Sequence, residues 1–244
     1  MNIVIQGAGR GIGLALAHRA QAAGATHLFL ASRLPEASPG YRALPPGPSV
    51  TWLAMDITVP DSIDQAANEI LATAPRIDRV ISTAGVLLDD RTRPEKRIND
   101  LNMDAMLYSY QINALGPVML CRALWPGLRG EHAVRIASLS ARVGSIGDNR
   151  LGGWYGYRAS KAAQNQLMRT LSIELARHNP AACVATLHPG TVDTDLSRPF
   201  QGNVPADKLF TAAYSADCLW DVLDKLRPAD TGGFFAYDGT SIPF

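Results

Sequence analysis

Near its start the chain reads Ile3-Val4-Ile5-Gln6-Gly7-Ala8-Gly9-Arg10-Gly11-Ile12-Gly13, and a helical pattern over residues 14–20 follows at once. The order is a short buried strand, a glycine turn and a helix. Glycines let the backbone turn tightly and approach a pyrophosphate, while a helix N-terminus offers free N–H groups and a positive dipole to an anion. Glycines also mark ordinary turns. Their place between a strand and a helix is the context that phosphate binding requires, so we predict a phosphate-bearing cofactor.

Outward from this turn, strand-like and helix-like segments alternate along the whole chain. The expected strands are residues 3–5, 27–31, 50–55, 79–82, 133–137, 183–187 and 233–237. The expected helices are residues 14–20, 61–72 with Asp61 as cap, 103–125 with a possible kink at Pro117, and 160–177. Strands separated by helices require a parallel sheet with right-handed crossovers. We therefore predict one α/β domain over residues 1–244, a doubly wound parallel sheet of about seven strands with helices on both faces.

Composition narrows the class of protein. Of 244 residues, 47% are hydrophobic and 18% charged, which is typical of a globular domain. The net charge of +1 indicates no nucleic-acid partner. The 3 cysteines and 5 histidines have no metal-ligand spacing, so we expect no metal and a reducing compartment. With no run that could span a bilayer and no leader-like start, the expected location is the cytoplasm, away from membranes.

Tyr157 and Lys161 form the clearest candidate catalytic pair. They stand in the run Tyr157-Arg158-Ala159-Ser160-Lys161, four residues apart, and so share one helix face. A neighbouring cation favours the phenolate and is expected to lower the tyrosine pKa toward neutrality. A tyrosine of that kind can act as a general acid or base. The alternative is a surface pair without function.

Taken together, the motifs resemble the classical short-chain dehydrogenase/reductase family. They are Gly7-x-x-x-Gly11-x-Gly13, Thr83-Ala84-Gly85, Asn113, a serine-rich strand end, Tyr157-x-x-x-Lys161 and His188-Pro189-Gly190, in one order over nearly the whole chain. The stretch of residues 140–146 and the tyrosine motif look like the small carbonyl-reductase and C-factor-like branch. The resemblance implies a Rossmann fold and hydride transfer between a nicotinamide and a carbonyl or alcohol substrate, with the protein supplying position and protons.

The resemblance assigns roles to four catalytic positions. Tyr157 gives its proton to the carbonyl oxygen, and Lys161 lowers the tyrosine pKa and holds the nicotinamide ribose. Asn113 anchors a water that relays protons from Lys161. A serine donates a hydrogen bond to the substrate oxygen.

The identity of that serine is open in the sequence. The family places it about a dozen residues before the tyrosine, whereas Ser138 and Ser140 lie nineteen and seventeen residues before Tyr157. An insertion over residues 146–153 accounts for the difference. Ser138 and Ser140 share one face of a continuing strand. We favour Ser140 over Ser138, with Ser145 as a third candidate.

The charge of the cofactor pocket favours NADP(H) over NAD(H). No carboxylate follows the second expected strand; Ser32 and Arg33 stand there, and Arg10 lies in the glycine turn. Guanidinium groups suit a 2′-phosphate, although both arginines can also be ordinary surface groups. Asp56 and Ile57 resemble the family's adenine contact. The full predicted cofactor set is Gly7, Gly9, Arg10, Gly11, Ile12, Gly13, Ser32, Arg33, Asp56, Ile57, Thr83, Ala84, Gly85, Tyr157, Lys161, Pro189, Gly190, Thr191, Val192 and Thr194.

Several features depart from the family or leave function open. Ser82-Thr83-Ala84-Gly85 replaces Asn-Asn-Ala-Gly, so an asparagine that stabilises the sheet is missing, and the Pro-rich connector of residues 34–49 is expected to hold little helix. Loops 193–208 and 87–97 are expected to close the pocket, with an apolar wall of Phe200, Leu151, Trp154 and Leu87 for a small carbonyl or alcohol substrate. A homodimer or homotetramer through helices 103–125 and 160–177 is expected. The alternative function is a dinucleotide-binding regulatory or signalling protein of the C-factor type.

Overall fold

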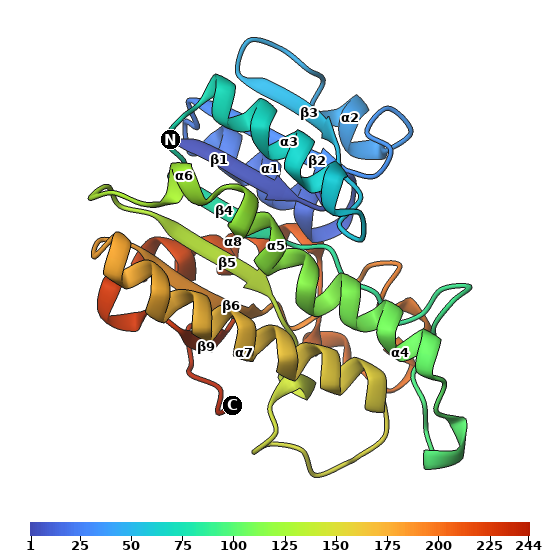
Figure 1. Cartoon of the computed structure of the whole chain (residues 1–244). Helices are drawn as coiled ribbons and strands as arrows, with labels where there is room; N and C mark the ends of the chain where they lie inside the picture. Colours follow the sequence, from blue (N-terminus) through green and yellow to red (C-terminus); the bar gives the residue numbers. More distant parts are fainter.

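The computed structural model describes the backbone of residues 1–244 and every side chain except that of Asn203. Its centre is a parallel sheet of seven strands in the order β3-β2-β1-β4-β5-β6-β9 (Figure 1). These strands are β1 (Asn2–Gln6), β2 (His27–Ser32), β3 (Val50–Ala54), β4 (Arg79–Ser82), β5 (Arg135–Leu139), β6 (Cys183–His188) and β9 (Gly233–Ala236). Successive strands are added on one side of β1 as far as β3 and then on its other side from β4 onward. Ligands bind at such a change in strand order in folds of this kind.

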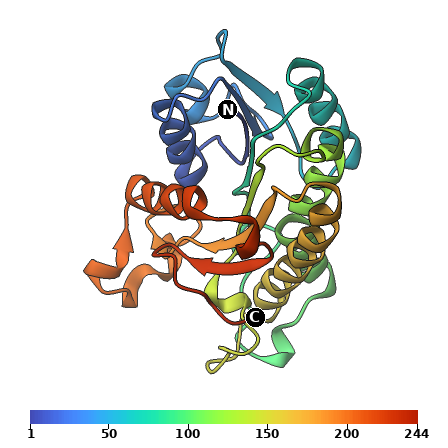
Figure 2. The same ribbon diagram turned by 90° about the vertical axis from the view of Figure 1, so that its left-hand side faces the viewer.

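Helices cover both faces of the sheet. The principal ones are α1 (Gly11–Ala22), α3 (Pro60–Thr73), α4 (Met103–Tyr110), α5 (Gly116–Ala123), α7 (Tyr155–His178) and α8 (Ala212–Lys225). Shorter elements are α2 (Pro39–Ala43), α6 (Trp125–Leu128) and a two-stranded ribbon of β7 (Thr191–Val192) and β8 (Leu209–Phe210). Figure 2 shows α1 and α8 on one side of the sheet and α3, α5 and α7 on the other.

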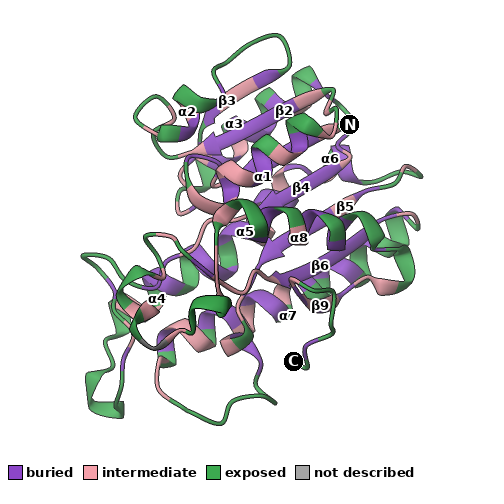
Figure 3. Cartoon of the chain, turned by 180° about the vertical axis from the view of Figure 1, so that it is seen from behind, coloured by how far each residue is buried: buried purple, intermediate pink, exposed green. Residues whose placement is uncertain are grey.

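Each layer has its own apolar core. Val4, Phe29 and Val80 point toward α3, α5 and α7, whereas Ile3, Ile5 and Leu28 join the cluster beneath α1 and α8. The alternation follows from the period of two in side-chain direction along a strand. Figure 3 accordingly shows the strands buried and the outward helix faces exposed. The predicted Rossmann-type doubly wound sheet of about seven strands is confirmed.

Two predicted helices have other bounds in the structure, and the sequence prediction missed α8 altogether. The helix expected over 160–177 begins at Tyr155, which places Tyr157 in its first turn. The helix expected over 103–125 is divided, because a π-helical segment, Gln111–Leu115, separates α4 from α5. Pro117 lacks an N–H donor, and the widened turn directly before it takes the place of the expected kink.

Smaller corrections concern the ends of elements. The fifth strand, expected over 133–137, lies at Arg135–Leu139, so Ser138 is within it and Ser140 just beyond its end. Asp61 lies in the first turn of α3 rather than at its cap, which is Val59 without a side-chain bond. The connector over 34–49 holds only the five-residue helix α2, as expected.

Candidate active site

The glycine turn between β1 and α1 leaves no room for a side chain at Gly7 or Gly13. Gly7 and Gly11 have φ angles of +88° and +55°, in the left-handed region that favours glycine. A Cβ on Gly13 would lie 2.2 Å from the Gly7 carbonyl oxygen, and one on Gly7 would lie 2.5 Å from Thr83 Oγ1. The glycines therefore hold β1, α1 and the end of β4 in close contact.

The N-terminus of α1 is open to an anion. Its cap, Arg10, makes no side-chain capping bond, and the first turn holds no acidic residue. The N–H groups of that turn and the helix dipole are thus free to meet a pyrophosphate. Together with the glycine turn, this geometry fits the phosphates of a dinucleotide.

The asparagine missing after β4 is replaced by two side chains. Thr83 Oγ1 donates to the carbonyl oxygens of Gln6 (2.9 Å) and Gly7 (3.2 Å). Gln6, buried at the end of β1, accepts from the Ser82 hydroxyl at 3.0 Å and from the Ala84 amide at 3.4 Å. The junction of β1 and β4 therefore keeps its polar cross-links. Sequence reasoning overlooked Gln6, although a glutamine that ends an otherwise apolar strand is a visible signal.

Asn113 lies in the π-helical segment, fully buried beside the end of β4. Its amide donates to the Val86 carbonyl at 2.9 Å and to Ser160 Oγ at 3.0 Å, while its oxygen accepts from the Val86 amide at 2.8 Å. A Cβ on Gly85 would lie 3.3 Å from Asn113 Oδ1 and 3.7 Å from Lys161 Nζ. The structure thus brings Gly85, Asn113 and Lys161 together.

Lys161 is a buried cation held by α7 and β5. Its Nζ donates to the Leu139 carbonyl at 2.8 Å and to Gln164 Oε1 at 2.9 Å, and only 3% of the residue is exposed. Burial lowers the pKa of Lys161 from its usual 10.5 to about 7. Gln164 also donates to Ser138 Oγ and to the Leu139 carbonyl. Sequence reasoning missed Gln164, which follows Lys161 by three positions and shares its helix face.

Tyr157 lies beside Lys161, with the Lys161 Nζ 5.8 Å from the centre of the tyrosine ring. Burial raises the pKa of Tyr157 above its usual 10. The predicted pKa near neutrality therefore does not hold for the protein alone, because desolvation of the phenolate outweighs any stabilisation by Lys161. Tyr157 is therefore a neutral phenol at physiological pH, which is the form that donates a proton.

The three candidate serines have different partners. Ser138 Oγ accepts from Gln164, and Ser145 Oγ accepts from the Asp148 amide at 3.1 Å. Ser140 Oγ is buried and has no hydrogen-bond partner among the described residues. A buried hydroxyl without a partner is costly, and it is free to serve a ligand.

The two arginines predicted near the 2′-phosphate differ in their ion pairs. Arg10 Nη1 lies 2.9 Å from Asp195 Oδ2, in an exposed ion pair between the glycine turn and the chain after β7. Arg33 forms no ion pair among the described residues. Ser32 Oγ, at the end of β2, is buried without a partner there. A Cβ on Gly9 would lie 3.4 Å from Ser32 Cβ and 3.0 Å from Ser38 Cβ, so Ser38, which the sequence did not single out, also borders this side.

Both residues predicted to contact the adenine, Asp56 and Ile57, have contacts within the protein. Asp56 Oδ1 accepts from the amide and the hydroxyl of Thr58, at 2.9 and 2.7 Å. Ile57 is buried against Gly116, where an added Cβ would lie 2.2 Å from Ile57 Cγ1. Asp56 Oδ2 accepts no hydrogen bond from the described side chains and backbone, so one carboxylate oxygen can still accept from a ligand.

The segment after β6 returns to the glycine turn. Pro189 and Gly190 lead into β7, which contains Thr191 and Val192. A Cβ on Gly11 would lie 3.4 Å from the Thr194 methyl group, and one on Gly85 would lie 4.0 Å from Leu196 Cδ1. This segment therefore covers the glycine turn and approaches the group around Lys161.

The structure brings together two of the residues predicted for an apolar wall, Trp154 and Phe200. The Trp154 ring lies 5.1 Å from that of Phe200 and 6.2 Å from that of Tyr157, centre to centre. Leu87 is buried, at 5% exposure. Leu151 is 93% exposed, on the loop that also holds Gly152 and Gly153, so its assignment to the wall is wrong. A residue in a surface loop next to two glycines, such as Leu151, is not packed against the protein core.

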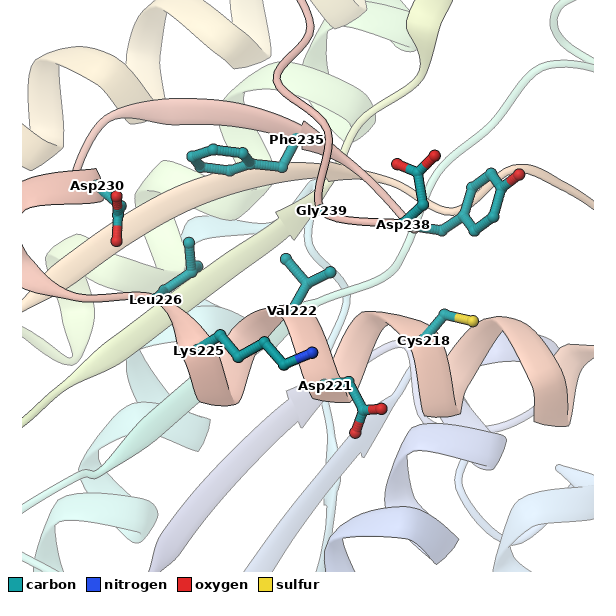
Figure 4. A pocket seen from close by; sticks show the side chains of 10 residues that line it. Cys218, Asp221, Val222, Lys225, Leu226, Asp230, Phe235, Asp238 and Gly239 are labelled. Atoms are coloured by element: carbon teal, nitrogen blue, oxygen red, sulfur yellow. The ribbon is translucent and has the colours of Figure 1, made fainter.

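A cavity elsewhere in the protein is unsuited to a phosphate-bearing cofactor. A cavity of about 360 Å³ lies between α8 and β9, and Asp221, Asp230 and Asp238 line it (Figure 4). These carboxylates would repel phosphates.

The described side chains form no metal-binding cluster, and no described helix is long and apolar enough to cross a membrane. Burial raises the pKa of Cys121 to about 12 and of Cys183 to about 11, as for inert buried thiols.

Comparison with known proteins agrees with this geometry. A family model described as short chain dehydrogenase matches residues 1–204. An uncharacterized oxidoreductase of Schizosaccharomyces pombe is 31% identical over 257 residues, which cover 98% of this chain and 96% of that protein. C-signal of Myxococcus xanthus is 38% identical over 148 residues, 60% of this chain and 83% of C-signal.

The solved structures point to the same branch. The NADPH-bound carbonyl reductase from chicken fatty liver matches with a TM-score of 0.87 and 26% identity, over 100% of this chain and 98% of that one. The buried Lys161 beside Tyr157, the open glycine turn and these matches share one explanation. The chain belongs to the short-chain dehydrogenase/reductase family, in its carbonyl-reductase and C-factor-like branch.

Proposed function

We propose that this protein is an NADP(H)-dependent oxidoreductase that interconverts a carbonyl compound and the corresponding alcohol, with Tyr157 as general acid and base. The observation that carries the proposal is the convergence of Lys161 and Asn113 at Gly85, with Tyr157 on the same helix as Lys161. When bound, the nicotinamide supplies or accepts the hydride.

Each catalytic side chain has a distinct task in this proposal. The neutral Tyr157 phenol donates its proton to the substrate oxygen in reduction, and the Lys161 ammonium stabilises the phenolate that is left. Ser140, whose hydroxyl has no partner among the described residues, donates a hydrogen bond to the same oxygen. Asn113 ties Val86 to Ser160 and so keeps the segment after β4 against α7, and its backbone is proposed to anchor a water for the proton relay.

The residues of the glycine turn and its neighbours would hold the cofactor. The N-terminus of α1 would bind the pyrophosphate, and Thr191, Val192 and Thr194 would contact it or the carboxamide. Arg33 and Ser32 would receive the 2′-phosphate, since Arg33 has no carboxylate partner among the described residues and Ser32 Oγ is free. Residues 1–244 would act as one cofactor-binding unit.

The substrate is proposed to be a small apolar carbonyl or alcohol. Trp154 lies next to Tyr157 and Phe200 lies next to Trp154, and aromatic rings stabilise apolar ligands through their large contact area. A homodimer or homotetramer in the cytoplasm remains our proposal for assembly and location. Exposed Met103 and Leu107 on α4 and Ile173 on α7 support a two-fold contact there, which light scattering of the purified protein tests.

A second candidate is a dinucleotide-binding signalling or regulatory protein with little turnover. The similarity to C-signal favours it. Such a protein would bind NADPH and would not need Tyr157 for its action. Turnover and its dependence on Tyr157 therefore separate the two proposals.

The test is NADPH oxidation with a panel of aldehydes, ketones and quinones, run beside Tyr157→Phe. We expect the variant to lose at least about 100-fold in kcat, because it lacks the acidic proton, while its Kd for NADPH stays unchanged. Tyr155→Phe, on the exposed start of the same helix, is the matched control and should behave as the parent. A parent without turnover on the whole panel, or an active Tyr157→Phe, would favour the signalling proposal.

A further inference from the structure

The helix that carries Tyr157 begins in an unusual way. Its N-cap, Trp154, has φ 52° and ψ 43°, and among the described residues it is the only non-glycine residue with a positive φ. A side chain rarely adopts this left-handed conformation unless surrounding contacts impose it. Trp154 makes no side-chain capping bond, and the first turn of α7 holds no acidic residue. Arg158, in the same helix, donates to the carbonyls of Gly152 and Gly153, and the remaining contacts that fix this turn come from another segment.

Those contacts come from Glu95. Its carboxylate Oε2 accepts from the Gly156 amide at 3.0 Å, and its main-chain oxygen accepts from the Trp154 amide. A Cβ on Gly156 would lie 2.8 Å from Glu95 Oε1, so only glycine allows this approach. One residue thus satisfies two of the free N–H groups at the start of α7, and its negative charge lies at the positive end of the helix.

Glu95 is buried, at 5% exposure, and forms no ion pair among the described residues. Its segment is tied to α4 on the other side. Tyr108 donates to Asp89 Oδ2 at 3.0 Å, and the hydroxyls of Thr92 and Ser109 lie 3.0 Å apart. Residues 89–95 therefore form a brace between α4 and the first turn of α7.

The brace acts on groups at the reaction centre. Tyr157 lies one residue after Gly156, and the Trp154 ring lies edge-on to Tyr157 and close to Phe200. If the turn relaxed, the phenol and the aromatic wall would both move. We propose that Glu95 is a positioning residue that holds the first turn of α7, and with it Tyr157 and Trp154, in the geometry for reaction. This inference rests on the proposed function of Tyr157.

The test compares Glu95→Leu with Glu95→Gln, because glutamine keeps an oxygen that accepts from Gly156 and leucine does not. We expect Glu95→Leu to lower kcat at least about 10-fold and to raise the substrate KM, with an NADPH Kd within about two-fold of the parent. Glu95→Gln should keep at least about half of the parent kcat. Glu174→Leu, at an exposed position of the same helix, is the control.

Hydrogen exchange of residues 151–158 gives a readout that needs no turnover. Glu95→Leu should exchange the amides of Trp154 and Gly156 faster than the parent, and Glu95→Gln should not. Gly156→Ala keeps the residue Glu95 but pushes its carboxylate away from the helix. If Glu95→Leu does not fold, Gly156→Ala should show the same faster exchange and lower kcat. Unchanged exchange and kcat in Glu95→Leu and Gly156→Ala would overturn the proposal. Faster exchange in a protein whose parent shows no turnover would instead overturn the reductase function and leave the brace intact.

Discussion

At the residue scale, the site is built from polar groups that burial has altered. Lys161 is a cation with a lowered pKa, Tyr157 is a phenol with a raised pKa, and Ser140 has a hydroxyl without a partner among the described residues. The buried Lys161 cation and the unpartnered Ser140 hydroxyl each cost stability in the protein alone. Such groups gather at functional sites, where a ligand supplies the interactions that the protein withholds.

The serines give a direct test at this scale. Ser140→Ala should lower kcat about 100-fold, as expected for the loss of one donor to a developing oxyanion, and leave NADPH binding intact. Ser138→Ala breaks the bond from Gln164 and should cost about 1 kcal/mol of stability with little change in kcat. Steady-state kinetics and urea unfolding of both variants measure this. The opposite pattern would move the role to Ser138, and loss of kcat only in Ser145→Ala would move it to that residue.

The lowered pKa of Lys161 predicts a pH dependence of stability. Lys161 titrates at about 7 when folded and near 10.5 when unfolded, so between these values the unfolded chain binds one more proton. The free energy of unfolding of the parent, measured relative to Lys161→Met, should therefore rise by about 1.4 kcal/mol per pH unit in that window. Below about pH 7 the difference should be constant, because both states then carry the charge. Urea unfolding of the two proteins at several pH values gives the slope, and parallel pH profiles would contradict it.

At the element scale, the contacts between elements matter more than the elements themselves. The π-helical segment between α4 and α5 places Asn113 against the end of β4, and the glycine turn places α1 against the same strand end. The sequence predicted one continuous helix over 103–125, and its division at 111–115 depends on this packing. Helix propensity alone does not distinguish a π turn from an α turn.

The glycine turn can be tested by adding one methyl group. Gly13→Ala places a Cβ 2.2 Å from the Gly7 carbonyl oxygen, so α1 must move away from β1. We expect a loss of roughly 2–3 kcal/mol in unfolding free energy and a large rise in the NADPH Kd. Gly47→Ala, where no atom lies within 4 Å of the added Cβ, is the matched control. A Gly13→Ala protein that binds NADPH like the parent would show that the close contact is not needed.

At the scale of the whole molecule, Arg10 and Asp195 join regions 185 positions apart. The pair connects the glycine turn with the segment that covers it, and Asp195 also binds Arg198 at 2.8 Å. The sequence suggested that Arg10 is available to the 2′-phosphate. In the structure its guanidinium is instead paired with Asp195. Both side chains of the Arg10–Asp195 pair are exposed, and exposed ion pairs contribute little free energy and are easily broken.

This pair predicts an effect on cofactor choice. The parent should bind NADPH more tightly than NADH, and Asp195→Asn should increase that preference about two- to five-fold by releasing Arg10, an effect that salt should weaken. Fluorescence titration with both cofactors measures the ratio. The Asp148→Asn protein, which breaks the exposed Arg142 pair instead, is the control. Equal constants for NADPH and NADH in the parent would remove the argument from the arginines.

The sequence by itself determined the glycine turn, the Tyr157 and Lys161 pair and most of the order of strands and helices, though not α8, because these depend on local periodicity and fixed spacing. Tertiary structure alone decided the roles that need distant partners. Gln6 and Thr83 replace the missing asparagine, Gln164 occupies Ser138 and leaves Ser140 free, and Glu95 caps the helix of Tyr157 from 61 positions away. The directions of the two pKa shifts belong here too, since desolvation depends on how the finished fold buries each group.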